Sequence, residues 1–495
     1  MLFNSYEFIF LFVPVAFFGF FRMARHSTRA AAAWLVAASL FFYGWWNPQY
    51  VLLLLGSIAF NYFAAGAIAD AGTPRRRKAL LCLAVAANLS LLGVYKYANF
   101  FIATVNDAGG FGWSALDILL PLGISFFTFT QIAFLVDVHR GITRDSSIVN
   151  YLLFVTYFPH LIAGPLLHHK QMMPQFARPE IYRLDPANVA AGLTLFTIGL
   201  AKKVLLADNF AVYATPVFGA AATGEHPHFF AAWSGTLAYT LQIYFDFSGY
   251  SDMALGISRL FNIHLPVNFN SPYKSRSIVD FWHRWHMTLS QFLRDYLYIP
   301  LGGNRRGRRR RYLALMTTML LGGLWHGANW TFVIWGALHG GYLVINHAWA
   351  GLTRGYKVRS PLLAQAGGVL SIAITFLAVT VAWVFFCAAD LATALLMLND
   401  MFALPSWPFA GEAGGALEDY KRFFAERGLS IRWFTCLTAL GLAIVWFAPN
   451  AQSYVSGESR LRWRIGPVTA VVWGGVLAWC MISMVAMSEF LYFQF

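Results

Sequence analysis

The sequence predicts an all-α, polytopic membrane protein. Of its 495 residues, 58% are hydrophobic and only 12% are charged, whereas soluble globular proteins carry about 25% charged residues. The stretches 366–387 and 468–487 are almost wholly apolar, and each is long enough to cross a hydrocarbon core of about 30 Å as a helix. The chain therefore has too few charged residues to form the polar surface of a water-soluble protein, and it has segments that suit a lipid bilayer.

The basic residues indicate which links face the cytoplasm. The net charge of +14 is concentrated in short links between apolar segments. These links hold Arg22/Arg25/Arg29, Arg75 to Lys78, Arg305 to Arg311, and Arg460/Arg462/Arg464. Such placement is typical of cytoplasmic loops and not of a nucleic-acid site. The lipid bilayer is therefore an expected partner, and nucleic acid is not.

With these links in the cytoplasm, the apolar segments form a consistent topological map. Those expected to cross are 6–23, 31–50, 51–70, 79–101, 366–388, 430–448 and 467–490. Alternating crossings place both termini and the acidic link 410–429 outside. About ten to twelve transmembrane helices fit the chain. We expect one membrane domain over 1–495, with N-terminal helices in 1–110, a core in 120–345 and C-terminal helices in 360–495.

The core segment differs from its flanks because glycine and proline interrupt its apolar runs. Examples are Pro121, Pro159, Gly164-Pro165 and Gly322-Gly323. Non-helical backbone at membrane depth is tolerated only where protein buries it or where it lines a watery cavity. The interruptions therefore predict re-entrant or broken helices around a central tunnel.

A first polar cluster lies in 242–252. On a helix, Gln242, Asp246 and Tyr250 share one face, and Ser248 and Asp252 share another. Carboxylates in a membrane-embedded run are costly unless they are paired or hydrated. The cluster either lines the tunnel or, in the more conservative interpretation, bonds to neighbouring helices and maintains the shape of the cavity.

A second cluster, 280–295, is expected to form one amphipathic helix at the cytoplasmic interface. Its polar residues recur every three or four positions, and tryptophans flank them. The stripe consists of Asp280, His283, His286, Ser290 and Arg294, with Arg284 beside it. His286 stands out because its helical neighbours include aromatic residues, and it is a candidate functional residue.

The third cluster is 320–330, where His326 lies among glycines in an apolar context beside Trp325 and Asn329. The preceding apolar run, 312–321, is too short to cross completely, so we expect His326 within the membrane. Imidazole is the usual general base near neutral pH, although a core histidine is often only structural. No carboxylate or cysteine accompanies His283, His286 and His326 at metal-ligand spacing, so neither a metal nor a bound cofactor is expected.

These clusters together resemble the membrane-bound O-acyltransferase family. The resemblance rests on 242–252, 284–305 and 322–329, and the runs 121–126, 158–165 and 492–495 fit its bacterial branch. That branch includes the alginate O-acetylation membrane subunit and the teichoic-acid D-alanyl transferase. One departure is His283, where many relatives have a second arginine beside the equivalent of Arg284.

The resemblance implies a bowl of tilted helices with a tunnel, in the multi-pass inner membrane of a bacterium. The invariant catalytic histidine of the family matches His326, which acts as a general base or a transient acyl carrier, and a second motif histidine matches His286. The supporting or tunnel-lining residues are then Asp246, Ser248, Tyr250, Asp252, Trp325, Asn329 and Arg284. The implied donor is acetyl-CoA or another acyl thioester on the cytoplasmic side. The implied acceptor is often a serine of an SGNH-hydrolase-like periplasmic partner.

The expected function is acetyl transfer across the membrane for O-acetylation of an exopolysaccharide, with alginate as the first candidate. Peptidoglycan, cellulose and D-alanyl transfer are alternatives within the same class. A polytopic transporter is the rival from another class, because broken helices and intramembrane polar groups also mark transport sites. A structural scaffold is a third hypothesis, but it does not require a histidine between glycines at membrane depth.

Overall fold

The computed structural model is all-α in the part of the chain that it describes, namely 1–143, 147–305, 307–355, 360–403, 415–461, 463–484 and 489–491. This confirms the predicted fold class. Glu412, Arg462 and the C-terminal motif 492–495 lie outside the described residues.

The N-terminal flank contains the following elements: η1 (Phe8–Phe12), α1 (Val13–Ala24), α2 (Thr28–Gly44), α3 (Gln49–Ala69), α4 (Pro74–Leu92), η2 (Gly93–Tyr97) and α5 (Ala98–Gly109). The C-terminal flank contains α17 (Pro361–Cys387), α18 (Leu391–Phe402), α19 (Ala416–Glu426), α20 (Ile431–Phe447), α21 (Ala451–Val455) and α22 (Pro467–Ser483). Each predicted flanking segment therefore contains helix, but α2 ends at Gly44 within the predicted segment 31–50, and α22 ends at Ser483 within 467–490, of which 485–488 lie outside the described residues.

The middle of the chain alternates long helices with helices of one or two turns, as the glycine and proline interruptions predict. Its elements are α6 (Ile124–His139), α7 (Ile148–Thr156), α8 (Phe158–Leu161), α9 (His169–Phe176), η3 (Pro179–Tyr182), α10 (Pro186–Ala201), η4 (Lys202–Ala207), α11 (Asp208–Ala222), α12 (His228–Leu260), η5 (Pro272–Lys274), α13 (Ile278–Trp282), α14 (Met287–Leu293), η6 (Arg294–Tyr298), α15 (Arg308–His326) and α16 (Trp330–Leu352).

Side-chain caps begin many of these helices, which matters in lipid because free backbone N–H groups find no water there. The capping side chain accepts a hydrogen bond from a backbone N–H of the first turn. The capping residues are Ser27, Thr73, Ser147, Asp185, Ser277, Asn329, Ser360, Asp390 and Ser430.

Four helical stretches in the described residues are long and apolar enough to span a membrane, and a fifth span results if the bent pair α19–α20 is counted as one. The four are Gln49–Ala69, Pro74–Gly109, Pro186–Ala222 and Pro361–Cys387. Four further apolar helices have only 10–17 residues. The predicted count of about ten to twelve spans is higher because it includes such short helices and the polar helices of the middle.

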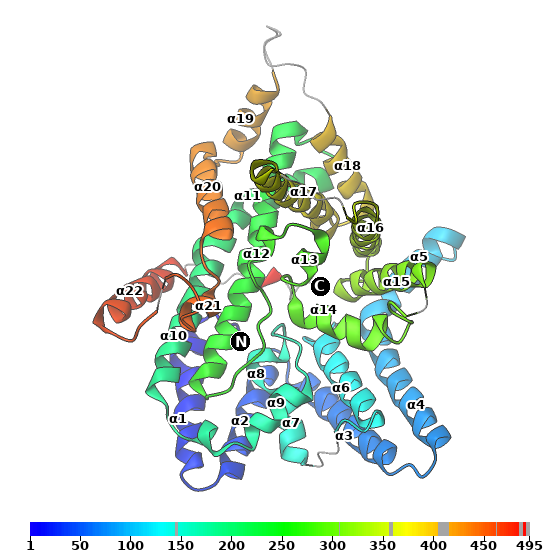
Figure 1. Cartoon of the computed structure of the whole chain (residues 1–495), viewed down its shortest axis with the longest axis vertical. Helices are drawn as coiled ribbons and strands as arrows, with labels where there is room; N and C mark the ends of the chain where they lie inside the picture. Colours follow the sequence, from blue (N-terminus) through cyan, green and yellow to red (C-terminus); the bar gives the residue numbers. More distant parts are fainter. Residues whose placement is uncertain are drawn as a thin grey trace.

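Helix α12 forms the centre of the molecule, and it contacts α10, α11, α17, α18, α19 and α20. The N-terminal helices lie at one end and α17–α20 at the other (Figure 1). Close packing against α10 depends on glycine, because a Cβ on Gly199 would lie 2.5 Å from the carbonyl oxygen of Gly249. Small residues of this kind let membrane helices approach closely.

Two apolar cores meet along α12. Its residues up to Phe247 belong to one core, and those from Tyr250 onward belong to the other. Large apolar side chains such as Phe18, Phe63 and Leu362 are exposed on the outer surface, whereas many polar groups are buried. This distribution suits a protein whose outer surface faces lipid.

Candidate active site

His326 lies where the two apolar cores meet. It is the last residue of α15, and its side chain is buried, with 3% of the residue exposed. The imidazole packs against Trp325 from one core and against Trp335 and Phe386 from the other, at ring-centroid distances of 4.9, 5.1 and 5.2 Å. About 22 Å of helix separates it from Arg311. The structure therefore gives His326 the buried, aromatic setting that its sequence context predicts.

Two glycines hold the end of α15 against α16. A Cβ on Gly323 would lie 2.2 Å from the carbonyl oxygen of Phe332, and one on Gly336 would lie 2.3 Å from that of Met319. Any side chain at either position would push the two helices apart. The glycines beside His326 thus have a packing role, and they fix its distance from Trp335.

His286 lies beside His326, with 6.3 Å between the ring centroids. It is fully buried and also packs against Phe247 at 4.8 Å. The expectation of one continuous amphipathic helix over 280–295 is wrong, because α13 ends at Trp282 and α14 begins at Met287. His286 itself adopts the left-handed conformation, with φ of 43°. This turn directs the imidazole inward instead of along the amphipathic stripe.

Asn268 holds the turn at His286. Its backbone carbonyl accepts from Met287 N at 2.9 Å, and its Oδ1 accepts from Thr288 Oγ1 at 2.9 Å. The same Oδ1 lies 3.1 Å from His286 Nδ1. Because an amide oxygen only accepts, this geometry assigns the proton to Nδ1 and the lone pair to Nε2. Thr288 Oγ1 also accepts from Leu166 N at 3.0 Å, directly after the 158–165 motif.

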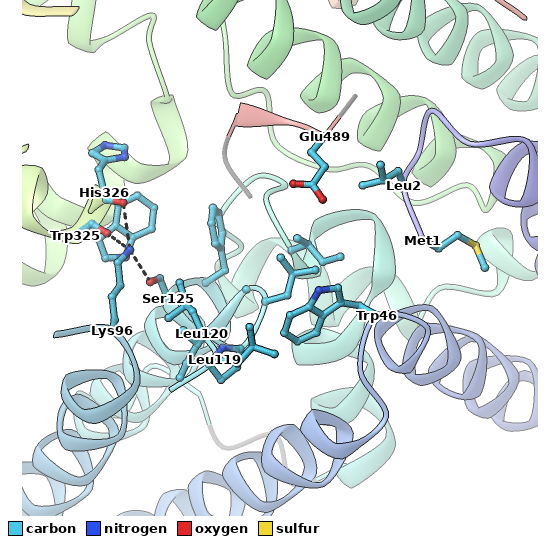
Figure 2. A pocket seen from close by; sticks show the side chains of 16 residues that line it. Met1, Leu2, Trp46, Lys96, Leu119, Leu120, Ser125, Trp325, His326 and Glu489 are labelled. Carbon is cyan, nitrogen blue, oxygen red and sulfur yellow. Dashed lines mark hydrogen bonds between the residues drawn. The ribbon is translucent and has the colours of Figure 1, made fainter. Parts of the chain in front are cut away.

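A cavity of about 400 Å³ opens on one side of the histidine pair. Trp325 and His326 form one wall, and Lys96 and Ser125 lie beside them (Figure 2). Glu489 stands across the cavity from His326. We call this the upper cavity.

A second cavity, of about 740 Å³, lies among α14, η6, α15 and α16. Its lining includes Met287 and Thr288, the neighbours of His286, and Thr318 and Met319 on α15. It also reaches Arg311, one of the basic residues at the start of α15. We call this the lower cavity. His326 lines the upper cavity, whereas His286 lines neither cavity, although its chain neighbours Met287 and Thr288 line the lower one.

The carboxylates of α12 are paired by lysines that the sequence interpretation did not single out. Lys202 Nζ lies 2.6 Å from Asp252, which also accepts from Gln452. Lys203 Nζ lies 2.7 Å from Asp246. This arrangement fits the structural interpretation of the cluster, since buried charges require partners.

The remaining predicted residues lie outside the walls of both cavities. Tyr250 stacks on Phe3 and meets the ring of Phe490 edge-on. Arg284 pairs with Asp280 at 2.7 Å, and Asn329 caps α16 and donates to Ala389 O at 2.8 Å. Ser248 is buried on α12. None of these residues, nor Asp246 or Asp252, lines the upper or the lower cavity.

Lys96, Asn268 and Glu489 are part of the site although the sequence interpretation did not name them. The lysine was detectable, because it is a lone charge in the apolar segment 79–101 and such residues are functional candidates by default. Glu489 was detectable in the same way, because it is the lone charge in the predicted span 467–490, whereas Asn268 carries no such local signal. Among the described residues, no group of three or more His, Cys, Asp or Glu side chains is placed to hold one metal ion.

The fold and site together define a multi-pass membrane protein with a buried histidine pair, one member of which lines a cavity. The family model described as MBOAT, membrane-bound O-acyltransferase family, matches residues 140–389. The chain belongs to this family and is an acyltransferase, which decides against the transporter and scaffold hypotheses.

Two relatives resemble most of the chain. The peptidoglycan O-acetyltransferase of Helicobacter pylori is 44% identical over 431 residues, covering 82% of this chain and 80% of that protein. A probable alginate O-acetylase of Pseudomonas aeruginosa is 43% identical over 413 residues, covering 82% of this chain and 76% of that protein. A teichoic acid D-alanyltransferase of Streptococcus thermophilus is 30% identical over 240 residues, covering 46% of this chain and 57% of that protein.

Proposed function

We propose that this acyltransferase passes an acetyl group from a cytoplasmic thioester, across a bacterial inner membrane, to an acceptor that O-acetylates a cell-surface polysaccharide. The observation that carries the proposal is the position of His326 in the wall of the upper cavity, with its ring centroid 6.3 Å from that of His286, whose chain neighbours Met287 and Thr288 line the lower cavity. A donor and an acceptor that enter from opposite sides can then meet at one buried imidazole pair.

The lower cavity suits an acyl thioester such as acetyl-CoA. Arg294 and Arg311 contribute positive charge for phosphate groups. Leu315 and Met319, about three and two turns before His326 on α15, provide apolar walls for the thioester end. Arg311 belongs to the basic cluster that the charge pattern assigns to the cytoplasm, where such thioesters occur.

In the reaction, His326 accepts the proton of the acceptor hydroxyl while the hydroxyl oxygen attacks the thioester carbonyl carbon. The carbon–sulfur bond then breaks, and the proton passes to the departing thiolate. Alternatively, the imidazole itself carries the acetyl group between the two partners. His286, fixed by Asn268, positions the donor carbonyl.

The upper cavity receives the acceptor. Its wall combines Lys96, Ser125 and Glu489 with Trp46 and Leu120, which suits a polar hydroxyl presented on a polypeptide loop. In keeping with the family resemblance, we infer that the acceptor is a serine of an extracytoplasmic hydrolase-like partner, which then acetylates the polymer.

Acetyl transfer is favoured over D-alanyl transfer because the Helicobacter pylori and Pseudomonas aeruginosa relatives, each above 40% identity, are named for acetylation. Deleting the gene is expected to remove ester-linked acetate from one polymer. Acetate released by mild base should be measured separately in alginate-type exopolysaccharide, cellulose and peptidoglycan, with ester-linked D-alanine as the parallel measurement. Restoration by the intact gene is the control, and unchanged ester content in every polymer would refute the proposed function.

Membrane topology provides an independent test of transfer across the bilayer. Reporters fused after Arg77 and after Arg309 are expected to lie in the cytoplasm, because basic loops are retained there. A reporter fused after Phe495 is expected outside. Paired phosphatase and fluorescent-protein fusions measure this directly. A cytoplasmic C-terminus would contradict both the map and the proposed crossing.

A further inference from the structure

The last three carbonyl groups of α15 are held by two side chains from the N-terminal flank. A helix leaves its final carbonyls without partners inside the helix. Tyr97 Oη donates to Leu324 O at 2.9 Å. Lys96 Nζ donates to Trp325 O at 2.7 Å and to His326 O at 3.2 Å. The end of the helix that carries His326 is thus fixed by residues more than two hundred positions away in the chain.

These two side chains come from a local irregularity. The π-helical turn η2 (Gly93–Tyr97) joins α4 to α5. Single π-turns inside α-helices are rare and frequently occur at functional sites. Here the irregular turn presents two consecutive residues, Lys96 and Tyr97, to the same partner helix.

The ammonium group of Lys96 uses all of its donors within the protein. Its third acceptor is Ser125 Oγ at 3.4 Å, in the first turn of α6 (Figure 2). An ammonium group has three N–H donors, so none is left to bind a substrate or a developing oxyanion. Its position at the C-terminus of α15 is also favourable, because that end of a helix carries partial negative charge. Although Lys96 lines the upper cavity, its contacts point to the helix and not to a ligand.

We propose that Lys96, assisted by Tyr97 and Ser125, is a positioning residue that fixes the C-terminal turn of α15 and thereby the imidazole of His326. The inference rests on the proposed function for the catalytic role of His326. It also gives a role to the 121–126 motif, since Ser125 orients the lysine. Loss of the ammonium group leaves the carbonyls of Trp325 and His326 without their donor, so the last turn frays and the imidazole loses its fixed place.

The test compares Lys96→Met, Lys96→Arg and Tyr97→Phe in the full-length protein. Methionine keeps the unbranched chain but donates nothing, whereas arginine keeps the charge and several donors. Lys421→Met is the matched control, because Lys421 is an exposed lysine paired with Glu418 on α19. Hydrogen–deuterium exchange of the peptide 318–328 reports the end of α15. Acetyl transfer with varied acetyl-CoA concentration reports kcat and KM.

Lys96→Met is expected to raise exchange in 318–328 about tenfold or more and to lower kcat about 10- to 100-fold, since small misplacements of reacting groups cost this much. The KM for acetyl-CoA should change less than about twofold. Lys96→Arg should keep most of the exchange protection and most of the wild-type kcat. Tyr97→Phe removes only one of the three hydrogen bonds to the last carbonyls of α15, so its effect should be smaller. The control should match the wild type.

The inference would be overturned if Lys96→Met had the exchange rate and the kcat of the wild type. A rise in KM without a fall in kcat would also overturn it, as would a Lys96→Arg variant that is as impaired as Lys96→Met. Hydrogen–deuterium exchange of 318–328 does not depend on the reaction, so failure of the proposed function can be distinguished from failure of this inference. If His326→Ala stays active while Lys96→Met frays α15, the proposed catalytic role of His326 fails and the fixation of α15 stands.

Discussion

Replacing His326 with alanine is expected to lower acyl transfer by about 10² to 10⁴, the usual contribution of a general acid or base. The loss should be larger if the imidazole carries the acetyl group. His326 ends α15 and is buried among Trp325, Trp335 and Phe386, so the alanine variant also removes packing. His326→Gln separates these effects, because glutamine fills a similar volume but is not a base. Both variants should be inactive.

The measurement is the ester-linked acetate of the target polymer, together with the amount of each variant in the membrane. His26→Ala is the matched control, because His26 is exposed and its imidazole contacts Arg22. Near-normal acetylation by a well-expressed His326→Ala protein would remove the catalytic assignment. Disappearance of His326→Ala from the membrane, with an active His326→Gln, would instead identify the histidine as a packing residue.

The sequence predicted those parts of the site that depend on local patterns. Glycines around a histidine in an apolar run pointed to His326, and the structure shows that Gly323 permits the close approach of α16. The polar spacing of 242–252 predicted a helix, and α12 contains all of it. Such features are visible in sequence because the relevant neighbours lie within a few turns of each other.

Features that depend on distant partners were not visible. The lysines that pair with Asp246 and Asp252 are on η4, and Lys96 reaches across from the N-terminal flank to α15. The break at His286 was also missed, since the three- and four-residue spacing of 280–295 suits one continuous helix. The tertiary contacts of Asn268 override that local preference.

Replacing His286 with alanine is expected to reduce acetyl transfer at limiting acetyl-CoA about 10- to 100-fold, because the donor carbonyl loses a group that positions it. Alanine also destabilises the left-handed turn at this position, where φ is 43°, so a second variant is needed. Asparagine tolerates the left-handed conformation better than most residues, and His286→Asn therefore preserves the turn while removing the imidazole. Initial rates at several acetyl-CoA concentrations provide the measurement.

His283→Ala is the companion variant, and we expect a far smaller effect from it. His283 lines the lower cavity but is exposed, whereas His286 is buried, with its ring centroid 6.3 Å from that of His326. If His286→Asn is as impaired as His286→Ala while His283→Ala stays within about threefold of the wild type, the buried imidazole itself serves the reaction. If His286→Asn is fully active, the residue matters only for the turn that separates α13 from α14, and His326 acts without a second histidine.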